Sequence, residues 1–297
     1  MYNQFFGNYL FSKGYVTKEQ LLPALLRQSK EMIRLSTLAL YSGYMSPDEI
    51  ENITKLQLNN TKNFGELATE NGFLTREQTL ELLDADFPAF LILGQILIDD
   101  GIFTYQEFAN ILADYRSQNE FLELELNEDN KDEIQCLIED FSLLSETSFS
   151  SFGKAYLELL FNNFIRFIGD DFSALPPDIC LEFPTEHCIT QPVNGSYEIN
   201  SYLSMDDETA LAFAERYSGE NYSEYNEFVQ AALEDFLNLH NGLFIVNASN
   251  DQSNELTIGV PEVVSDSILN FENQAYHFPI CYPFGIVHYV IEIINIK

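Results

Sequence analysis

The chain has 297 residues, of which 46% are hydrophobic and 14% aromatic, and its formal net charge is −33 at pH 7. This apolar content supports packed cores and excludes a wholly disordered chain. The negative charge repels phosphate backbones and anionic lipid, so we expect no nucleic-acid or membrane-surface binding and favour a protein partner with a basic patch. The length predicts two domains or one large one.

Targeting and redox features are few. No apolar run reaches about 18 residues, so we expect no transmembrane span. The N-terminus lacks the basic start and long apolar stretch of a secretory signal, so a cytoplasmic location with reduced thiols is expected. His187, Cys188 and Cys180 match no familiar zinc spacing, and we expect neither a metal ion nor a cofactor on this chain.

The N-terminal third repeats every 29 residues without gaps. One position is always glycine: Gly14, Gly43, Gly72 and Gly101. Three residues later comes a helix-capping hydroxyl, and three after that a Gln or Glu: Thr17 and Gln20, Ser46 and Glu49, Thr75 and Gln78, Thr104 and Glu107. Each copy therefore predicts a short helix, a glycine stop and a longer helix that begins with a capping box. Residues 1–117 should form an all-α array of four stacked helical hairpins.

The repeat also resembles a known family. Its first copy places Phe6-Gly7, Leu10 and Gly14 ahead of Leu25 and Gln28. This spacing is similar to the LGxxLxxxG…LxxQ half-motif of MshEN modules, found at the N-termini of type II secretion and type IV pilus ATPases. In that family two half-motifs in tandem can hold cyclic di-GMP, so the four copies would make two MshEN-like modules.

By that resemblance Arg34, Gln28 and Gln57 are the candidate nucleotide-binding residues. Only Arg34 keeps the family's arginine, and Ser36 stands where a glycine would allow close backbone approach. Together with the acidic surface, these departures favour a helical interaction scaffold over cyclic di-GMP binding.

Acidic residues interleaved with Leu and Ile fill the middle of the chain, from 118 to 147. The change in charge predicts a domain boundary at this place. We expect an acidic linker with one docked amphipathic helix; an acidic arm that contacts a basic partner is the alternative.

Residues 148–297 mix helices with strands of period two. Helices are predicted at 152–168, 205–219 and 226–241, the last with Gly242 just past its end. Strands are predicted at 188–203, folded into a hairpin at Asn194-Gly195, and at 243–248, 256–260, 275–282 and 286–296. Helices that do not alternate regularly with an antiparallel sheet give an α+β domain.

The helix at 226–241 carries the candidate site. Its apolar stripe consists of Val229, Ala232, Leu233, Phe236 and Leu237. Asp235 and Asn238 are three residues apart and lie side by side, roughly opposite the stripe. Such a pair can orient a water or bind a partner's cation, although polar residues opposite an apolar stripe are also the ordinary solvent-facing side of a helix.

The segment from Asp235 to Gly242 resembles the E-x-x-N-x-x-x-G segment of CheX, in the CheC/CheX/FliY chemotaxis phosphatases. The strand and helix at 201–220 also resemble that family, and the likeness covers roughly residues 148–297. It implies dephosphorylation of a response-regulator receiver such as CheY, in two-component signalling. Asn238 would orient a water for attack on the aspartyl-phosphate, Asp235 would pair with the receiver's lysine, and the Mg²⁺ would belong to the receiver.

Two features qualify this prediction. Asp235 is one methylene shorter than the family's Glu, and the exposed Glu234 forms an i, i+4 pair with Asn238. We expect Glu234 and Asn241 to contact the partner.

The resemblance also implies a homodimer through the C-terminal domain. The alternative function is a non-catalytic adaptor that binds a response regulator or another protein, modulated by cyclic di-GMP at the repeats.

Overall fold

The computed structural model describes residues 6–125, 131–144, 149–252 and 255–294. The chain divides into two compact units, Met1–Glu128 and Asp129–Lys297. Within the predicted acidic linker, residues 126–130 and 145–147 lie outside the described residues, as do the last residues of the predicted strand 286–296. No helix in the described ranges is long and apolar enough to cross a membrane.

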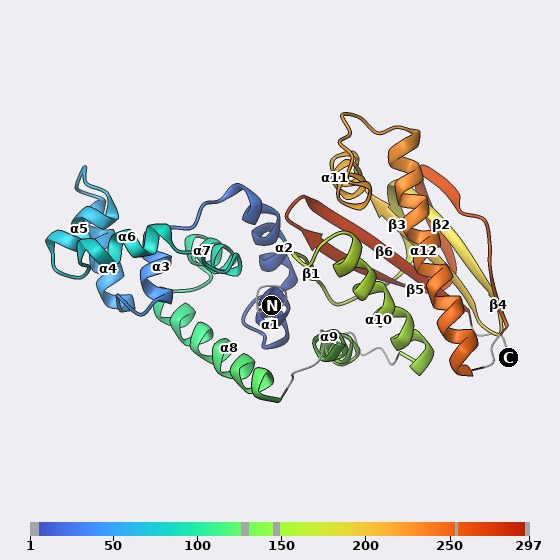
Figure 1. The fold of residues 1–297 in the computed structure, drawn as a ribbon, viewed down its shortest axis with the longest axis horizontal. Coiled ribbons are helices and arrows are strands. Elements are labelled where there is room, and N and C mark those ends of the chain that lie inside the picture. Colours follow the sequence, from blue (N-terminus) through green and yellow to red (C-terminus); the bar gives the residue numbers. More distant parts are fainter. Residues whose placement is uncertain (1–5, 126–130, 145–148, 253–254, 295–297) are drawn as a thin grey trace. The chain divides into compact units, whose positions relative to one another are not determined.

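The first unit is helical (Figure 1). Its elements are α1 (Phe6–Ser12), α2 (Lys18–Arg27), the short 3₁₀ helix η1 (Gln28–Lys30), α3 (Leu35–Tyr41), α4 (Pro47–Gln57), α5 (Phe64–Glu70), α6 (Arg76–Asp84), α7 (Phe90–Asp99) and α8 (Tyr105–Glu125). Helix α8 therefore runs beyond residue 117, the predicted end of the repeat region.

Local sequence signals fix the ends of these helices. The four repeated glycines all have φ between +71° and +74°, a left-handed conformation that glycine adopts without steric cost. The Gln or Glu of each predicted capping box accepts a hydrogen bond from the backbone N–H three residues earlier, at 2.7 to 2.9 Å. These caps confirm the predicted starts of α2, α4, α6 and α8.

Contacts within the first unit also join copies distant in sequence. The Phe6 ring lies 4.8 Å from that of Phe90 and 4.9 Å from that of Tyr115, between ring centroids. Tyr9 donates a 2.6 Å hydrogen bond to Asp114. The first copy therefore packs against the fourth. The four-hairpin array and the MshEN-like assignment stay predictions.

The second unit combines helices with an antiparallel sheet. The helices are α9 (Lys131–Leu144), α10 (Ser151–Phe167), α11 (Asp207–Ser218) and α12 (Glu227–Gln252). The strands are β1 (Ser173–Ala174), β2 (Asp178–Gly195), β3 (Glu198–Met205), β4 (Leu256–Ile258), β5 (Glu262–Tyr282) and β6 (Gly285–Ile294). The sheet order is β1-β5-β6-β3-β2-β4, with a further pairing of β5 with β2.

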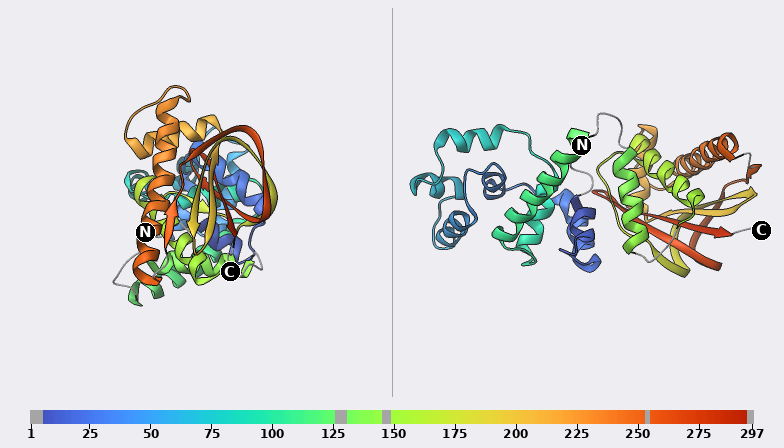
Figure 2. Two further views of the ribbon diagram at one scale, coloured as in Figure 1. Left: turned by 90° about the vertical axis from the view of Figure 1, so that its right-hand side faces the viewer. Right: turned by 90° about the horizontal axis from the view of Figure 1, so that it is seen from below.

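Strand β5 has two partners. Its C-terminal end pairs with β6, with Phe278 opposite Tyr289. Most of the strand, from Glu262 to His277, pairs with β2, with Ser267 opposite Thr185. Because β2 also pairs with β3, and β3 with β6, the four strands close on one another. Figure 2 shows these strands curling round in its left view.

Several predicted elements of this unit are confirmed. The hairpin at Asn194-Gly195 joins β2 to β3. Helix α11 is capped by the Asp206 side chain and ends at Gly219, whose φ is +75°. Strands β5 and β6 form the predicted closing pair, but β5 begins at Glu262 rather than 275, and β2 begins at Asp178 rather than 188.

Two predictions at the centre of this unit are wrong. Helix α12 does not end before Gly242 but continues to Gln252, and residues 243–248 are helical rather than a strand. Phe244 and Ala248 are buried and extend the apolar stripe at helical spacing. Their burial outweighs the cost of about 1 kcal/mol for a glycine inside a helix.

Candidate functional site

Helix α12 positions the candidate site. The five predicted stripe residues are all buried, and the helix packs on β2 and β4 and against α10 and α11 (Figure 1). Phe236 takes part in this anchoring, because its ring lies 5.1 Å from the rings of both Phe164 and Phe213. The opposite side of α12 is left to solvent, and Asp235 and Asn238 are both exposed on it.

Helix α11 holds Asp235. The Tyr217 hydroxyl donates a 2.6 Å hydrogen bond to Asp235 Oδ2. The Tyr217 ring packs edge-on against Phe236, with 5.8 Å between ring centroids and 86° between ring planes, and this packing fixes the position of the hydroxyl. Burial and the Asp235 carboxylate raise the pKa of Tyr217 well above its ordinary value. Tyr217 is therefore a permanent donor to this carboxylate at physiological pH.

Strand β2 holds Asn238. Gln191 Nε2 donates to Asn238 Oδ1 at 2.9 Å and to the carbonyl oxygen of Gly259 at 3.0 Å. Asp235 and Asn238 are thus held by two different neighbouring elements. An exposed acid and an exposed amide with fixed orientations need little reorganisation to engage a charged partner.

The two side chains predicted to contact the partner differ in exposure. Glu234 is half-buried and accepts a 2.7 Å hydrogen bond from Gln230, one turn earlier on α12. Asn241 is fully buried, so its predicted partner contact is wrong. Its position on the helix explains the error, since it continues the inward stripe once α12 runs past Gly242.

Tyr217 and Gln191 were not identified from the sequence. Gln191 did carry a signal, because it shares the inward face of β2 with Ile189 and Val193, which lie two residues before and after it. A glutamine at an inward strand position requires hydrogen-bond partners in the core. Tyr217 carried no comparable signal, since its partner lies in another helix.

Two of the three predicted nucleotide residues of the first unit already bind other groups. Arg34 pairs with Asp99 through two hydrogen bonds, at 2.7 and 2.6 Å. Gln28 Nε2 donates to the carbonyl oxygen of Ala89 at 3.0 Å. Gln57 is half-buried at the end of α4. Cyclic di-GMP binding stays a prediction.

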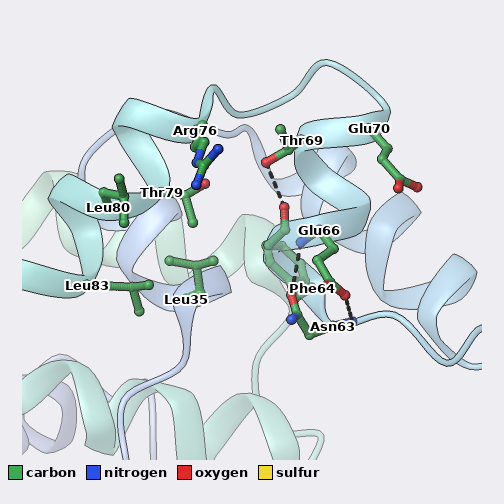
Figure 3. A pocket seen from close by; sticks show the side chains of 11 residues that line it. Leu35, Asn63, Phe64, Glu66, Thr69, Glu70, Arg76, Thr79, Leu80 and Leu83 are labelled. Carbon is green, nitrogen blue, oxygen red and sulfur yellow. Dashed lines mark hydrogen bonds between the residues drawn. The ribbon is translucent and has the colours of Figure 1, made fainter.

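Helices α3, α5 and α6 enclose a groove of about 650 Å³ in this unit (Figure 3). Leu80 and Leu83 line it from α6, Leu35 from α3, and Phe64 from α5. Arg34, Gln28 and Gln57 are not among its lining residues. The groove is therefore a different place from the predicted nucleotide site.

One group of described residues has the composition of a metal site. Glu186, His187 and Asp207 have candidate ligand atoms within 4.8 Å of one another. His187 Nε2 already lies 2.6 Å from Asp207 Oδ1, and the His187 ring stacks on Tyr225 at 3.6 Å. His187 Nε2 is thus already hydrogen-bonded to Asp207, whereas the buried His187 Nδ1 has no hydrogen-bond partner among the described residues; the geometry alone assigns no ion.

Comparison with known proteins relates the second unit to one family. The family "Chemotaxis phosphatase CheX" matches residues 188–285. This part of the chain is CheX-like. The matched range holds Asp235 and Asn238 with Tyr217 and Gln191, the residues that hold them. No curated protein matches the chain.

Solved structures resemble the same part of the chain at low identity. CheX from Desulfovibrio desulfuricans is 11% identical, with a TM-score of 0.42 over 49% of this chain and 100% of that one. A CheC-like protein from Shewanella sp. PV-4 is 16% identical, with a TM-score of 0.44 over 50% and 99%. The Borrelia burgdorferi CheX–CheY–BeF₃–Mg²⁺ complex gives 19% and 0.42 over 48% and 97%.

Proposed function

We propose that the CheX-like part removes the phosphoryl group from the aspartyl-phosphate of a CheY-like response regulator, through a D-x-x-N variant of the E-x-x-N motif. The observation that carries the proposal is the exposure of Asp235 and Asn238 on one helix, each fixed by a hydrogen bond from a neighbouring element. The family match supports the class of reaction.

The proposed reaction is a hydrolysis. Water attacks the phosphorus, the bond from phosphorus to the receiver's aspartate oxygen breaks, and the products are inorganic phosphate and the free carboxylate. Asn238 orients the water in line with that bond, and Asp235 pairs with the receiver's lysine. Positioning and electrostatics are the usual means of assisting such a transfer, so this chain needs no nucleophile of its own.

The test is phosphate release from a phosphorylated receiver, with and without the protein. We expect wild type to accelerate release, and Asn238→Ala to lower the rate by about 10²-fold, the order of loss that follows misplacement of a reacting group. Asn162→Ala is the matched control, because within the described residues the Asn162 side chain donates only to the Glu158 carbonyl on α10. Equal rates for wild type and Asn238→Ala would refute the proposal.

The adaptor function is the second candidate, and the length of Asp235 favours it. Its carboxylate, one methylene shorter than Glu, is already bonded to Tyr217. A protein that captures a phosphorylated receiver without hastening phosphate release would be this adaptor. The homodimer also stays a prediction. Exposed Ile179, Leu181 and Ile268 on the neighbouring strands β2 and β5 support it, because exposed apolar side chains on a sheet favour burial against a second chain.

A further inference from the structure

A chain of hydrogen-bonded side chains runs from the core of the second unit to Asn238. Its inner members are fully buried: Tyr289 on β6, Tyr156 on α10, Asn241 on α12, and Gln191 and Ser201 on β2 and β3. The links are Tyr289–Tyr156 at 2.7 Å, Tyr156–Asn241 at 2.7 Å, Asn241–Gln191 at 2.9 Å and Gln191–Asn238 at 2.9 Å. Side chains from five elements thus form one network, and Gln191 joins this network to the exposed Asn238 amide.

The direction of every hydrogen bond in this chain is determined. The carbonyl of Gly259 can only accept, so the Gln191 atom that faces it is Nε2. The same nitrogen faces Asn238, which must therefore present Oδ1 to it. The other end of the Gln191 amide, Oε1, accepts from Asn241 Nδ2.

The inner half of the chain agrees with this assignment. Asn241 Nδ2 donates its second proton to Ser201 Oγ, and the Ser201 hydroxyl in turn donates to the main-chain carbonyl oxygen of Gln191. Asn241 Oδ1 accepts the single hydroxyl proton of Tyr156, so Tyr289 must be the donor to Tyr156. Reversing any one amide would set two donors or two acceptors face to face.

The orientation of Asn238 follows from this chain. Its Oδ1 is turned inward to Gln191, and no hydrogen bond joins its Nδ2 to another described residue. We propose that Gln191 is a positioning residue that fixes the Asn238 amide with Nδ2 outward, presenting an N–H donor to an oxygen at the partner's phosphorylated pocket. The role of that donor rests on the proposed function, whereas the fixed orientation does not.

The first arm of the experiment reads orientation without a receiver. In side-chain amide NMR of the full chain, we expect the Gln191 Nε2 protons to be protected from exchange and the Asn238 Nδ2 protons to exchange with water. Gln191→Met should lower the order parameter of the Asn238 amide below about 0.6, the range of flexible groups. Asn163→Leu is the control, because it removes a buried amide that bonds His240 and is not part of the hydrogen-bonded series that ends at Asn238.

The second arm reads activity. Gln191→Met should lower kcat by about 10- to 100-fold with KM changed less than about 2-fold, and should add nothing in an Asn238→Ala background. Asn238→Asp keeps the inward acceptor and replaces only the outward nitrogen, so it should lose as much activity as Asn238→Ala. Because Asn238 is exposed, this variant tests the proposal even where Gln191→Met fails to fold.

The outcomes separate the two proposals. A wild-type protein without phosphatase activity would refute the proposed function, and the NMR arm would still decide the orientation. Rapidly exchanging Gln191 Nε2 protons, an Asn238 amide equally ordered in Gln191→Met, or an active Asn238→Asp would each overturn the positioning role of Gln191.

Discussion

At the scale of single residues, the acid of the candidate site depends on a tyrosine from another helix. The Tyr217 hydroxyl bonds Asp235, while its ring packs against Phe236 and Phe167. Tyr217→Phe removes the donor and keeps the ring. We expect the dissociation constant for a phosphorylated receiver to rise about 3- to 10-fold, since one hydrogen bond contributes about 1 kcal/mol.

Titration calorimetry with the receiver measures this change. Tyr222→Phe is the matched control, because the Tyr222 hydroxyl contacts Ser218 instead of Asp235. Similar affinities for wild type and Tyr217→Phe would show that Asp235 needs no such support.

His240 gives the fold a dependence on pH. It is fully buried, and burial lowers the pKa of its ring from 6.5 to about 3. The unfolded chain then binds more protons below pH 6.5, so the contribution to stability that is present above this pH is lost as pH falls toward 3. We expect the free energy of unfolding to drop by up to about 1.4 kcal/mol per pH unit in this window.

Urea unfolding at pH 7 and pH 5 measures the effect. Phenylalanine preserves the ring beside Tyr156 and cannot take up a proton, so His240→Phe should lose about 2 kcal/mol less than wild type between these two pH values. The same loss in both proteins would contradict a buried neutral His240.

At the scale of elements, α12 shows where local pattern stops being sufficient. The Asn194-Gly195 hairpin and the caps of the first unit were predictable because their signals lie within a few neighbouring residues. Residues 243–248 form a short apolar run that fits a strand or a buried helix equally well, and Gly242 suggested a stop. The core around Phe244 decided the outcome, and no local signal contains it.

Glycine substitutions test the length of α12. Inside a helix, Gly242→Ala should raise the free energy of unfolding by about 0.5 to 1 kcal/mol, and an added Cβ there meets no atom within 4 Å. Gly219 has equal space but a φ of +75°, so Gly219→Ala should lower stability by about 1 kcal/mol or more. Thermal or urea unfolding compares the two variants. A Gly242→Ala variant less stable than wild type would instead support the predicted end of the helix at residue 241.

At the scale of the whole molecule, the sequence predicted the α+β class, the antiparallel sheet and the exposed Asp235–Asn238 pair. It did not predict the partners that fix this pair, because Tyr217 and Gln191 approach α12 from elements separated along the chain. Nor did it predict that β5 pairs with both β6 and β2, since pairing between strands far apart in the sequence leaves no pattern in the sequence of either strand.

The two-way pairing of β5 sets the order in which the molecule can be completed during synthesis. Glu262 pairs with Thr190 and His277 with Asp178, so β2 emerges from the ribosome long before its second neighbour exists. Until then the nascent chain carries an open strand edge, the surface on which unfinished proteins aggregate. Long-range closure is also slow, so this edge stays open for longer than the edge of a strand whose partner is local in sequence.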